Sequence, residues 1–288
     1  MDGKNHLVEL IGFTDPYCTW CWGSEPILRK IGEVYGSQIK TGYVMGGLVK
    51  DIREFYDPLN RIGGKDWNQQ VAKHWLEASE AHGMPVDEKV FYDIGNDFWS
   101  TYPANIAVKA AEFQEIDKAT RFLRRLREAA SAERKQIHKE DVQAELATEV
   151  GLDESRLLLD VRSGKAREAF GEDLGICRKY GVTGFPTFLV RNREGSENIV
   201  GGYHHFEYFE KAFRDFSPNI REQKQEFNET NILRFIRKHG KVATIEVAIL
   251  FDINKAQASQ SLEILTKEKS IYTVEAGNDF FWTILISG

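Results

Sequence analysis

The first 50 residues alternate between apolar runs typical of buried strands and one amphipathic segment. Residues 6–13 form a short β-rich run that ends at a turn-forming Asp-Pro pair. From residue 22 to about residue 35, apolar residues recur every three to four positions, as on the buried face of a helix, and Gly36 ends the repeat. A second apolar run covers residues 39–44. The order strand, helix, strand predicts a βαβ unit and therefore an α/β fold.

Helical periodicity replaces the strand signals in the middle of the chain. Beyond it, a helical stretch ends near residue 180, residues 182–190 are expected to form a turn that leads into a strand, and a second strand is expected at 198–201. Residues 206–216 then form an amphipathic helix. We therefore expect an all-helical insertion at 51–164 inside an α/β domain made of residues 1–50 and 165–217. The helices expected within the insertion are 67–82, 89–99, 103–114, 116–130 and 139–150.

The end of the chain has a pattern of its own. Residues 218–229 are polar and charged, which predicts a linker before a separate unit at 230–288. That unit reads as three helices followed by a hairpin of two apolar strands, an order that resembles a winged helix. It is expected to be a small winged-helix-like α+β domain. Its expected helices are 231–239, 245–251 and 255–269, and its strands are 271–274 and 280–286.

Composition and charge limit the classes of protein to which this chain can belong. The chain has 288 residues, 42% of them hydrophobic, which is enough for about two domains. Its formal net charge of -6 argues against broad coating of nucleic acid. No run approaches the roughly 18 apolar residues that a membrane span needs. The N-terminus lacks the basic flank and cleavage site of a secretory signal, so we expect a cytoplasmic protein without membrane contact.

Cysteine usage supplies the candidate chemistry. The three cysteines, Cys18, Cys21 and Cys177, are too few, and odd in number, for a disulfide scaffold. Cys18 and Cys21 lie at the predicted strand-to-helix turn, where the helix dipole should acidify the first thiol. Cys18 is then the attacking thiolate, and Cys21 resolves the mixed disulfide. Cys177 falls on the inner face of a helix and is expected to be a core residue.

At this point the sequence resembles a family. Residues 15–22, DPYCTWCW, resemble the active-site segment of DsbA-like thioredoxin-fold proteins, and Pro26 is similar to the helix proline of thioredoxins. Residues 182–188 resemble the family's cis-proline segment. The resemblance spans about residues 7–216 and implies a thioredoxin fold with an inserted helical domain. It also implies that Phe185 and Pro186 lie against the cysteines and help to bind substrate, and Trp20, beside the pair, is a further candidate for substrate contact.

The resemblance implies disulfide exchange with a protein or a small thiol, glutathione among them, without cofactor or metal. In a reducing cytoplasm, reduction or isomerisation is favoured over oxidation. The dipeptide Thr19-Trp20 carries no charge, unlike the histidine of strongly oxidising members, so we expect a less acidic thiol. Two alternatives stay open. One is a non-catalytic DsbA-like adaptor or redox sensor, like those that deliver a regulator to a protease. The other is a redox-gated DNA-binding regulator.

The remaining patterns favour ordinary interpretations. A zinc site would need two ligands beyond the cysteine pair, and no second ligand pair has suitable spacing. Residues 225–288 carry seven Lys or Arg against eight Asp or Glu, so DNA binding is not expected. Dimerisation and partner docking remain possible roles for this tail. Four arginines form a run that we interpret as a solvated helix face, at positions Arg121, Arg124, Arg125 and Arg127.

Overall fold

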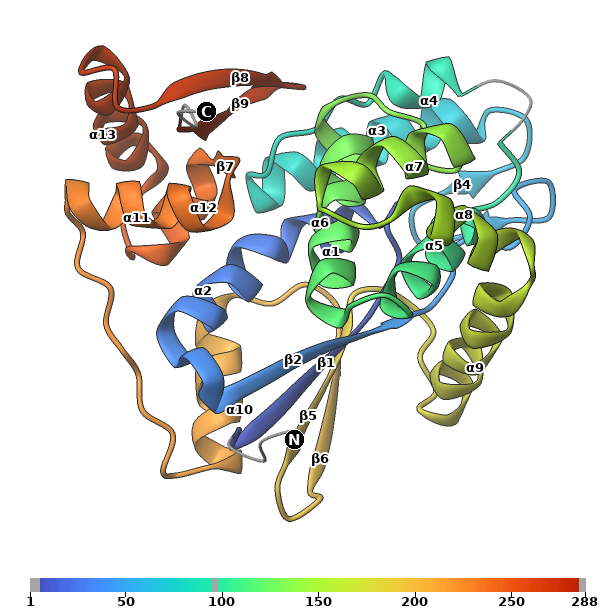
Figure 1. Cartoon of the computed structure of the whole chain (residues 1–288), viewed down its shortest axis with the longest axis horizontal. Helices are drawn as coiled ribbons and strands as arrows, with labels where there is room; N and C mark the ends of the chain where they lie inside the picture. Colours follow the sequence, from blue (N-terminus) through green and yellow to red (C-terminus); the bar gives the residue numbers. More distant parts are fainter. Residues whose placement is uncertain (1–5, 95–97, 285–288) are drawn as a thin grey trace.

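The computed structural model describes residues 6–94 and 98–284. The chain folds around a four-stranded mixed sheet, which lies at the bottom of Figure 1. Strand β1 (Val8–Thr14) is central, with β2 (Ile39–Met45) parallel on one side and β5 (Thr187–Asn192) antiparallel on the other. Strand β6 (Glu197–Gly201) pairs antiparallel with β5 and lies at one edge of the sheet, with β2 at the other. This sheet confirms the predicted α/β fold, with two strands from each end of the first 217 residues.

Helices cover both faces of the sheet. Helix α2 (Glu25–Tyr35), joined to β2 by the short helix η1 (Gly36–Gln38), and helix α10 (Phe206–Phe216) share one apolar core with β1 and β5. On the other face, Cys177 of α9 (Lys165–Lys179) packs with Phe13 and Leu189, so its predicted place in the core is confirmed.

The middle of the chain is mostly helical, as expected, and forms a layer above the sheet (Figure 1). A small hairpin of β3 (Tyr56–Asp57) and β4 (Ile62–Gly63) was not expected, because two-residue strands carry no readable period. The prediction of a helix at 89–99 is also wrong. The structure has a single helical turn there, α4 (Val90–Asp93), and part of the predicted segment lies outside the described residues. The other helices are α3 (Trp67–His82), α5 (Tyr102–Glu112), α6 (Ile116–Ala132), α7 (Glu140–Glu149) and α8 (Glu154–Arg162).

The C-terminal unit has three helices and a hairpin in the expected order. Residues 217–228 contain no helix or strand and lead into it. An additional strand, β7, joins the hairpin in a sheet of order β7-β9-β8, and the last two residues of the predicted second strand lie outside the described residues. The assignment to the winged-helix family stays a prediction. The elements are α11 (Glu229–His239), β7 (Val242–Ala243), α12 (Thr244–Leu250), α13 (Lys255–Lys267), β8 (Tyr272–Ala276) and β9 (Asp279–Thr283).

The tip of the C-terminal hairpin docks on the helical insertion. The Asn278 backbone N–H donates to the Val86 carbonyl over 3.0 Å, and its side-chain oxygen accepts from the Val86 N–H over 2.9 Å. Behind the tip, Phe281 meets the Trp22 ring edge to face, with 6.3 Å between the ring centroids. Gly277 adopts φ +55°, and a Cβ there would lie 2.1 Å from the Val86 carbonyl oxygen. The close approach therefore requires glycine.

Within residues 6–94 and 98–284, every helix is too short or too polar to cross a membrane.

We predict that Gly277→Ala destabilises the protein by about 2–4 kcal/mol, because left-handed strain adds to a clash with the backbone of Val86. The matched control is Gly195→Ala in the turn between β5 and β6, where φ is also positive but no atom lies within 4 Å of the new Cβ. It should cost only the strain, about 1–2 kcal/mol. Equilibrium urea unfolding measures both losses. Equal losses for the two variants would contradict the docking.

Candidate functional site

The cysteine pair lies where β1 gives way to the first helix, α1 (Thr19–Gly23). Cys18 is the N-cap residue, and its sulfur accepts a hydrogen bond from the Cys21 backbone N–H over 3.1 Å. Both are free thiols and both are buried, with 5% of Cys18 and 2% of Cys21 exposed. One helical turn separates the two residues, and their roles in disulfide exchange stay predictions.

The second predicted motif lies beside the first. The Phe185–Pro186 peptide bond is cis, as the family resemblance implied. Phe185 lines a cavity together with Cys18 and Trp20. Pro186 is buried, and its carbonyl accepts a hydrogen bond from the Gly202 N–H over 2.7 Å. The structure thus brings Cys18, Trp20 and Phe185 together, while the substrate-binding roles of Trp20, Phe185 and Pro186 stay predictions.

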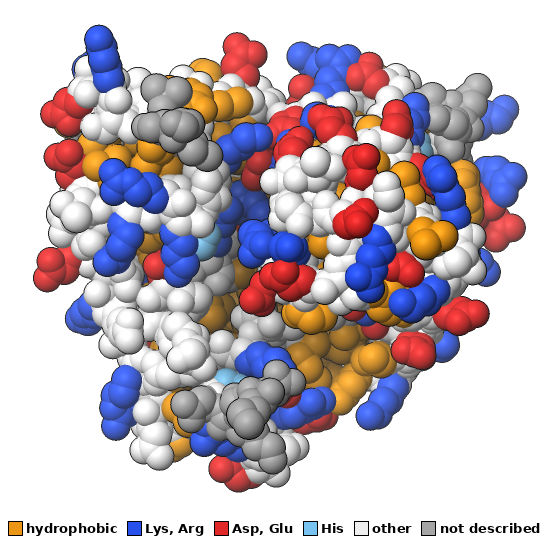
Figure 2. Space-filling model, viewed as in Figure 1, with side chains coloured by type: hydrophobic (Ala, Val, Ile, Leu, Met, Phe, Trp, Pro, Cys, Tyr) orange, Lys and Arg blue, Asp and Glu red, His pale blue; other side chains and the backbone are white. Residues whose placement is uncertain are grey.

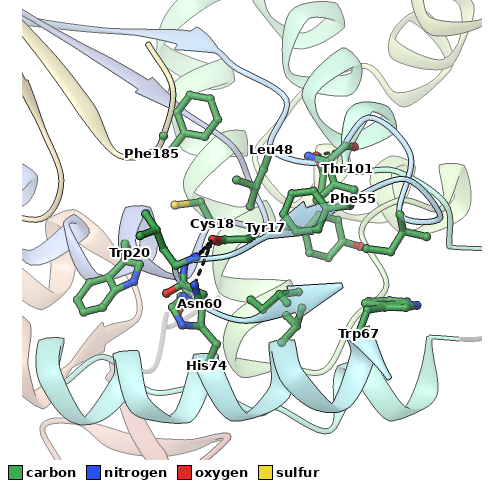
Figure 3. Close-up of a pocket in the computed structure, with 18 of the residues that line it drawn as sticks. Tyr17, Cys18, Trp20, Leu48, Phe55, Asn60, Trp67, His74, Thr101 and Phe185 are labelled. Carbon is green, nitrogen blue, oxygen red and sulfur yellow. Dashed lines mark hydrogen bonds between the residues drawn. The ribbon is translucent and has the colours of Figure 1, made fainter. Parts of the chain in front are cut away.

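This cavity, which holds about 680 Å³, is mainly apolar and opens in front of Cys18 (Figure 3). Its far wall comes from the β3–β4 hairpin and from α3, segments that the sequence analysis did not connect with the site. The sequence offered one sign of this wall, which was a cluster of large apolar residues in a segment without helical period. The wall includes Phe55, which comes just before β3, together with Tyr56, Leu59, Trp67 and His74.

The hairpin presents unusual apolar exposure at the cavity. Leu59 is 92% exposed and Tyr56 is 73% exposed, although both also line the cavity. Leu48, on the loop after β2, is partly exposed nearby. Large apolar side chains gathered at the mouth of a cavity are typical of surfaces that bind another molecule.

The two tryptophans that flank Cys21 have different environments. Trp22 is fully buried and donates its indole N–H to the Pro85 carbonyl over 2.8 Å, so it is a packing residue. Trp20 lines the cavity, with its ring 5.9 Å from His82 and 5.8 Å from Tyr203 between centroids. Burial lowers the pKa of His82 to about 4, so this imidazole is neutral at pH 7.

Asp15 fixes the loop beside Cys18. Its buried carboxylate accepts hydrogen bonds from the Leu48 N–H over 2.7 Å and from the Tyr17 N–H over 2.8 Å. It also accepts from the Thr101 hydroxyl over 2.7 Å and from the Asn105 amide over 2.8 Å. Burial raises the pKa of Asp15 despite these donors. The carboxylate therefore ties the start of α1 to the loop after β2 and to α5.

The charges around the pair differ from expectation. Burial raises the pKa of Cys18, and contact with Cys21 and the Asp15 charge raise it further. Burial also acts to raise the pKa of Cys21, but the thiol of Cys18, the Arg127 charge and Thr14 outweigh it, so that pKa is lowered. The sequence analysis expected the acidified thiol at Cys18. The Cys21 N–H that donates to the Cys18 sulfur favours a thiolate there, whereas burial of Cys18 opposes it.

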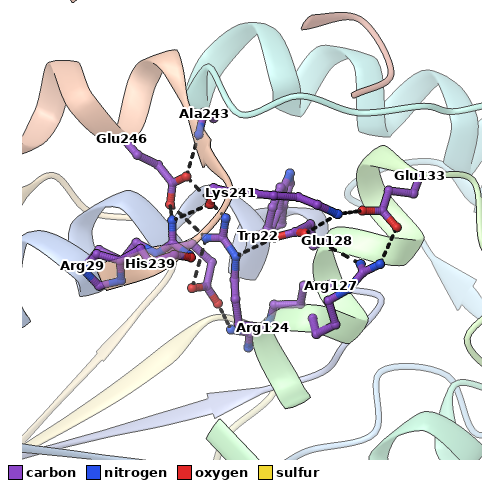
Figure 4. Close-up of polar contacts among 12 residues, drawn as sticks. Trp22, Arg29, Arg124, Arg127, Glu128, Glu133, His239, Lys241, Ala243 and Glu246 are labelled. Carbon is purple, nitrogen blue, oxygen red and sulfur yellow. Dashed lines mark hydrogen bonds and ion pairs between the residues drawn. The ribbon is translucent and has the colours of Figure 1, made fainter. Parts of the chain in front are cut away.

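The arginine run of α6 is not a solvated face, which corrects the sequence analysis. Arg124, Arg125 and Arg127 are turned into the protein, and only Arg121 is exposed. All three form ion pairs with carboxylates from α2, α6 and α12, in a cluster where Figure 4 labels Arg124 and Arg127. On the molecular surface, Lys and Arg side chains gather in the hollow where the C-terminal unit meets the insertion (Figure 2).

We predict that Gly46→Ala destabilises the protein by about 1–3 kcal/mol, because the new Cβ would lie 2.0 Å from the end of the Phe185 ring. In a Phe185→Ala background the same change should cost almost nothing, which unfolding free energies of the four proteins would show as coupling. Gly184→Ala is the control, since no atom lies within 4 Å of its Cβ. Additive losses would mean that the ring does not lie against Gly46.

Phe185→Ala should also speed alkylation of Cys18 by iodoacetamide.

The amino-acid sequence resembles those of known proteins along most of its length. Residues 12–211 match the protein family described as thioredoxin. The ClpXP adapter protein SpxH of Halalkalibacterium halodurans is 28% identical over 284 residues, which cover 98% of this chain and 90% of that protein. SpxH of Bacillus subtilis is 26% identical, covering 96% and 89%.

Solved structures show the same fold. The cytosolic disulfide reductase DsbM of Pseudomonas aeruginosa matches with a TM-score of 0.54 and 23% identity, covering 72% of this chain and 94% of that one. A structure described as a probable DsbA oxidoreductase from Streptomyces coelicolor matches with a TM-score of 0.55 and 17% identity, covering 77% and 94%. The family match covers most of the chain and includes both motifs of the site. The chain therefore belongs to the thioredoxin family, and its fold is DsbA-like.

Proposed function

We propose that this chain is an adapter that binds a protein through the cavity beside Cys18 and delivers it to the ClpXP protease. The observation that carries the proposal is the β3–β4 hairpin, which holds Leu59 and Tyr56 largely exposed at the cavity. Keeping these groups in water is unfavourable, and a bound protein surface would cover them. Aromatic and large apolar side chains beside a pocket commonly anchor such contacts.

The extent of the matches supports an adapter. The relatives named as ClpXP adapters align along nearly the whole chain, including its C-terminal unit. The matched reductase is used almost completely, at 94%, yet leaves 28% of this chain unmatched (100% minus the 72% that is covered). The adapters therefore account for more of this chain than the reductase does.

Cys18 lies in the wall of the cavity, where a bound segment would touch it. Burial raises the pKa of its thiol. The predicted cytoplasmic location suits a protein that works with a protease. We do not propose DNA binding, because contacts with Val86 already occupy the tip of the C-terminal hairpin.

We predict that ClpXP degrades a client protein faster when this chain is added, and that the Cys18→Ser, Cys21→Ser double variant accelerates degradation equally. The client is chosen as a protein that accumulates in the host both without this chain and without ClpX, and its decay is followed with purified components. Leu59→Asp should reduce the acceleration at least about tenfold by placing a charge in an apolar contact.

The matched control for that experiment is Leu159→Asp on α8. This leucine is 65% exposed but is not among the residues that line the cavity. It should accelerate degradation as the wild type does. Degradation that is indifferent to this chain, or equally impaired by both leucine variants, would contradict the proposal.

A second candidate function is thiol–disulfide exchange, which the geometry of the pair favours. A Cys18 thiolate would attack a substrate disulfide, form a mixed disulfide and release one substrate thiol. Cys21 would then attack the Cys18 sulfur and release the second thiol. The pair ends as a disulfide, having passed two electrons to the substrate.

We predict a reversible two-electron transition of the Cys18–Cys21 pair in glutathione redox buffers, read by trapping free thiols with an alkylating agent. The transition should vanish in Cys18→Ser and persist in Cys177→Ala, because Cys177 is buried on another helix. A pair that stays reduced in every buffer would exclude exchange and leave the adapter proposal untouched.

A further inference from the structure

The segment that follows helix α3 lies between the cysteine helix and the C-terminal unit. Helix α3 ends at His82, and residues 83–86 continue from it without helix or strand. On the side of the cysteine helix, the Trp22 indole N–H donates to the Pro85 carbonyl over 2.8 Å. At the other end of the segment, Val86 is fully buried. A buried backbone group without a partner is costly, so the position of this segment depends on what its N–H and C=O groups bond.

The C-terminal unit supplies such partners through one residue. Asn278, at the tip of the β8–β9 hairpin, bonds both backbone groups of Val86, over 3.0 Å at the carbonyl and 2.9 Å at the N–H. Its side-chain amide also donates to the Ser79 hydroxyl over 3.2 Å. That hydroxyl in turn donates to the Met84 carbonyl over 2.8 Å. Asn278 therefore holds the segment at two points, directly at Val86 and through Ser79 at Met84.

His82 stands between that segment and the cavity. The Met84 N–H donates to Nδ1 of His82 over 3.1 Å and so orients the imidazole. The ring lies directly against α1, because a Cβ added to Gly23 would fall 2.4 Å from its carbon atoms. Trp20 meets the same ring at 81°, with 5.9 Å between the centroids, and lines the cavity beside Cys18 (Figure 3). A shift of the segment would therefore move the ring that supports this wall of the cavity.

We infer that Asn278 is a positioning residue for the cavity, which acts through the 83–86 segment and His82 to hold Trp20 and the start of α1 in place. The C-terminal unit is then part of the construction of the site. What this means for a client rests on the proposed function. The positioning itself is tested on the protein alone, so its failure is distinguishable from failure of the adapter proposal.

Coupling of this kind acts in both directions. A molecule that binds the cavity against Trp20 strengthens docking of the hairpin by the same factor by which docking strengthens its binding. A client anchored at Leu59 and Trp20 would therefore tighten the C-terminal unit on the insertion. Conversely, a partner that drew the hairpin away from Val86 would weaken the hold on the client. The C-terminal unit thereby gains a role in releasing what the cavity binds.

We predict that Asn278→Ala raises the rate at which iodoacetamide alkylates Cys18 by about fivefold, because loss of one ordinary hydrogen bond changes a local opening equilibrium by about that factor. All proteins carry Cys21→Ser, so that Cys18 is the thiol that reacts at the site. Cys177 is the internal reference, since it is buried on α9 and packs against the sheet. Its rate should not change. Ser79→Ala should act on Cys18 in the same direction, and mass spectrometry of one digested sample gives both rates.

The matched control is Asn254→Ala in the same C-terminal unit. Asn254 caps α13 by accepting from the Gln257 N–H over 2.9 Å, a bond that does not reach the insertion. This variant should weaken its own unit yet leave the alkylation of Cys18 near the wild-type rate. Near-ultraviolet circular dichroism gives a second readout, taken as the difference between each protein and its Trp20→Phe counterpart. The Trp20 signal should fall in Asn278→Ala and persist in Asn254→Ala.

The alternative is that the hairpin stabilises the fold as a whole without acting on the cavity. In that case the rates of Cys18 and Cys177 would rise together, or Asn278→Ala and Asn254→Ala would have equal effects. Either result, or an unchanged rate at Cys18, would overturn the inference. If Asn278→Ala does not fold, Ser79→Ala decides the question alone by the same ratio of rates.

Discussion

The buried ion pairs around Glu25 and Glu246 are the interaction on which the rest of the structure depends. They join α2 of the sheet domain, α6 of the insertion and α12 of the C-terminal unit at one place. Charges removed from water destabilise a fold strongly when one partner is missing. The three segments must therefore assemble together, and the walls of the cavity take their positions from that assembly.

Local pattern was enough to predict the elements near the cysteines. The apolar period of α2, the strands on either side of it and the two family motifs are readable because each depends on neighbours in sequence. The arginine run could not be interpreted in the same way. The Arg127–Glu25 contact spans 102 positions and the Arg124–Glu246 contact spans 122, so a helix face that looks solvated in sequence is buried by distant acids.

The cavity was missed for a related reason. Its far wall depends on two strands of two residues each, which are too short to show alternation in the sequence. The wall also depends on the loop after β2, which Asp15 holds by a hydrogen bond while it also binds Thr101 at the start of α5. Leu59 and Tyr56 show no period in the sequence, and only the fold places both side chains on the wall of the cavity that Cys18 also lines. Sequence reasoning located the cysteine pair and the cis-proline segment but not the cavity wall that lies beside them.

Helix α1 connects that surface to the C-terminal unit. Trp20 and Trp22 lie on either side of Cys21, yet Trp20 lines the cavity while Trp22 packs against Phe281 and under the Arg124 guanidinium, 4.5 Å from its ring centroid. A helix of one turn has little freedom when one of its side chains is fixed in a packed core. Docking of the C-terminal hairpin therefore fixes Trp22, and through the same turn it fixes Trp20, Cys18 and the wall that a bound protein would meet.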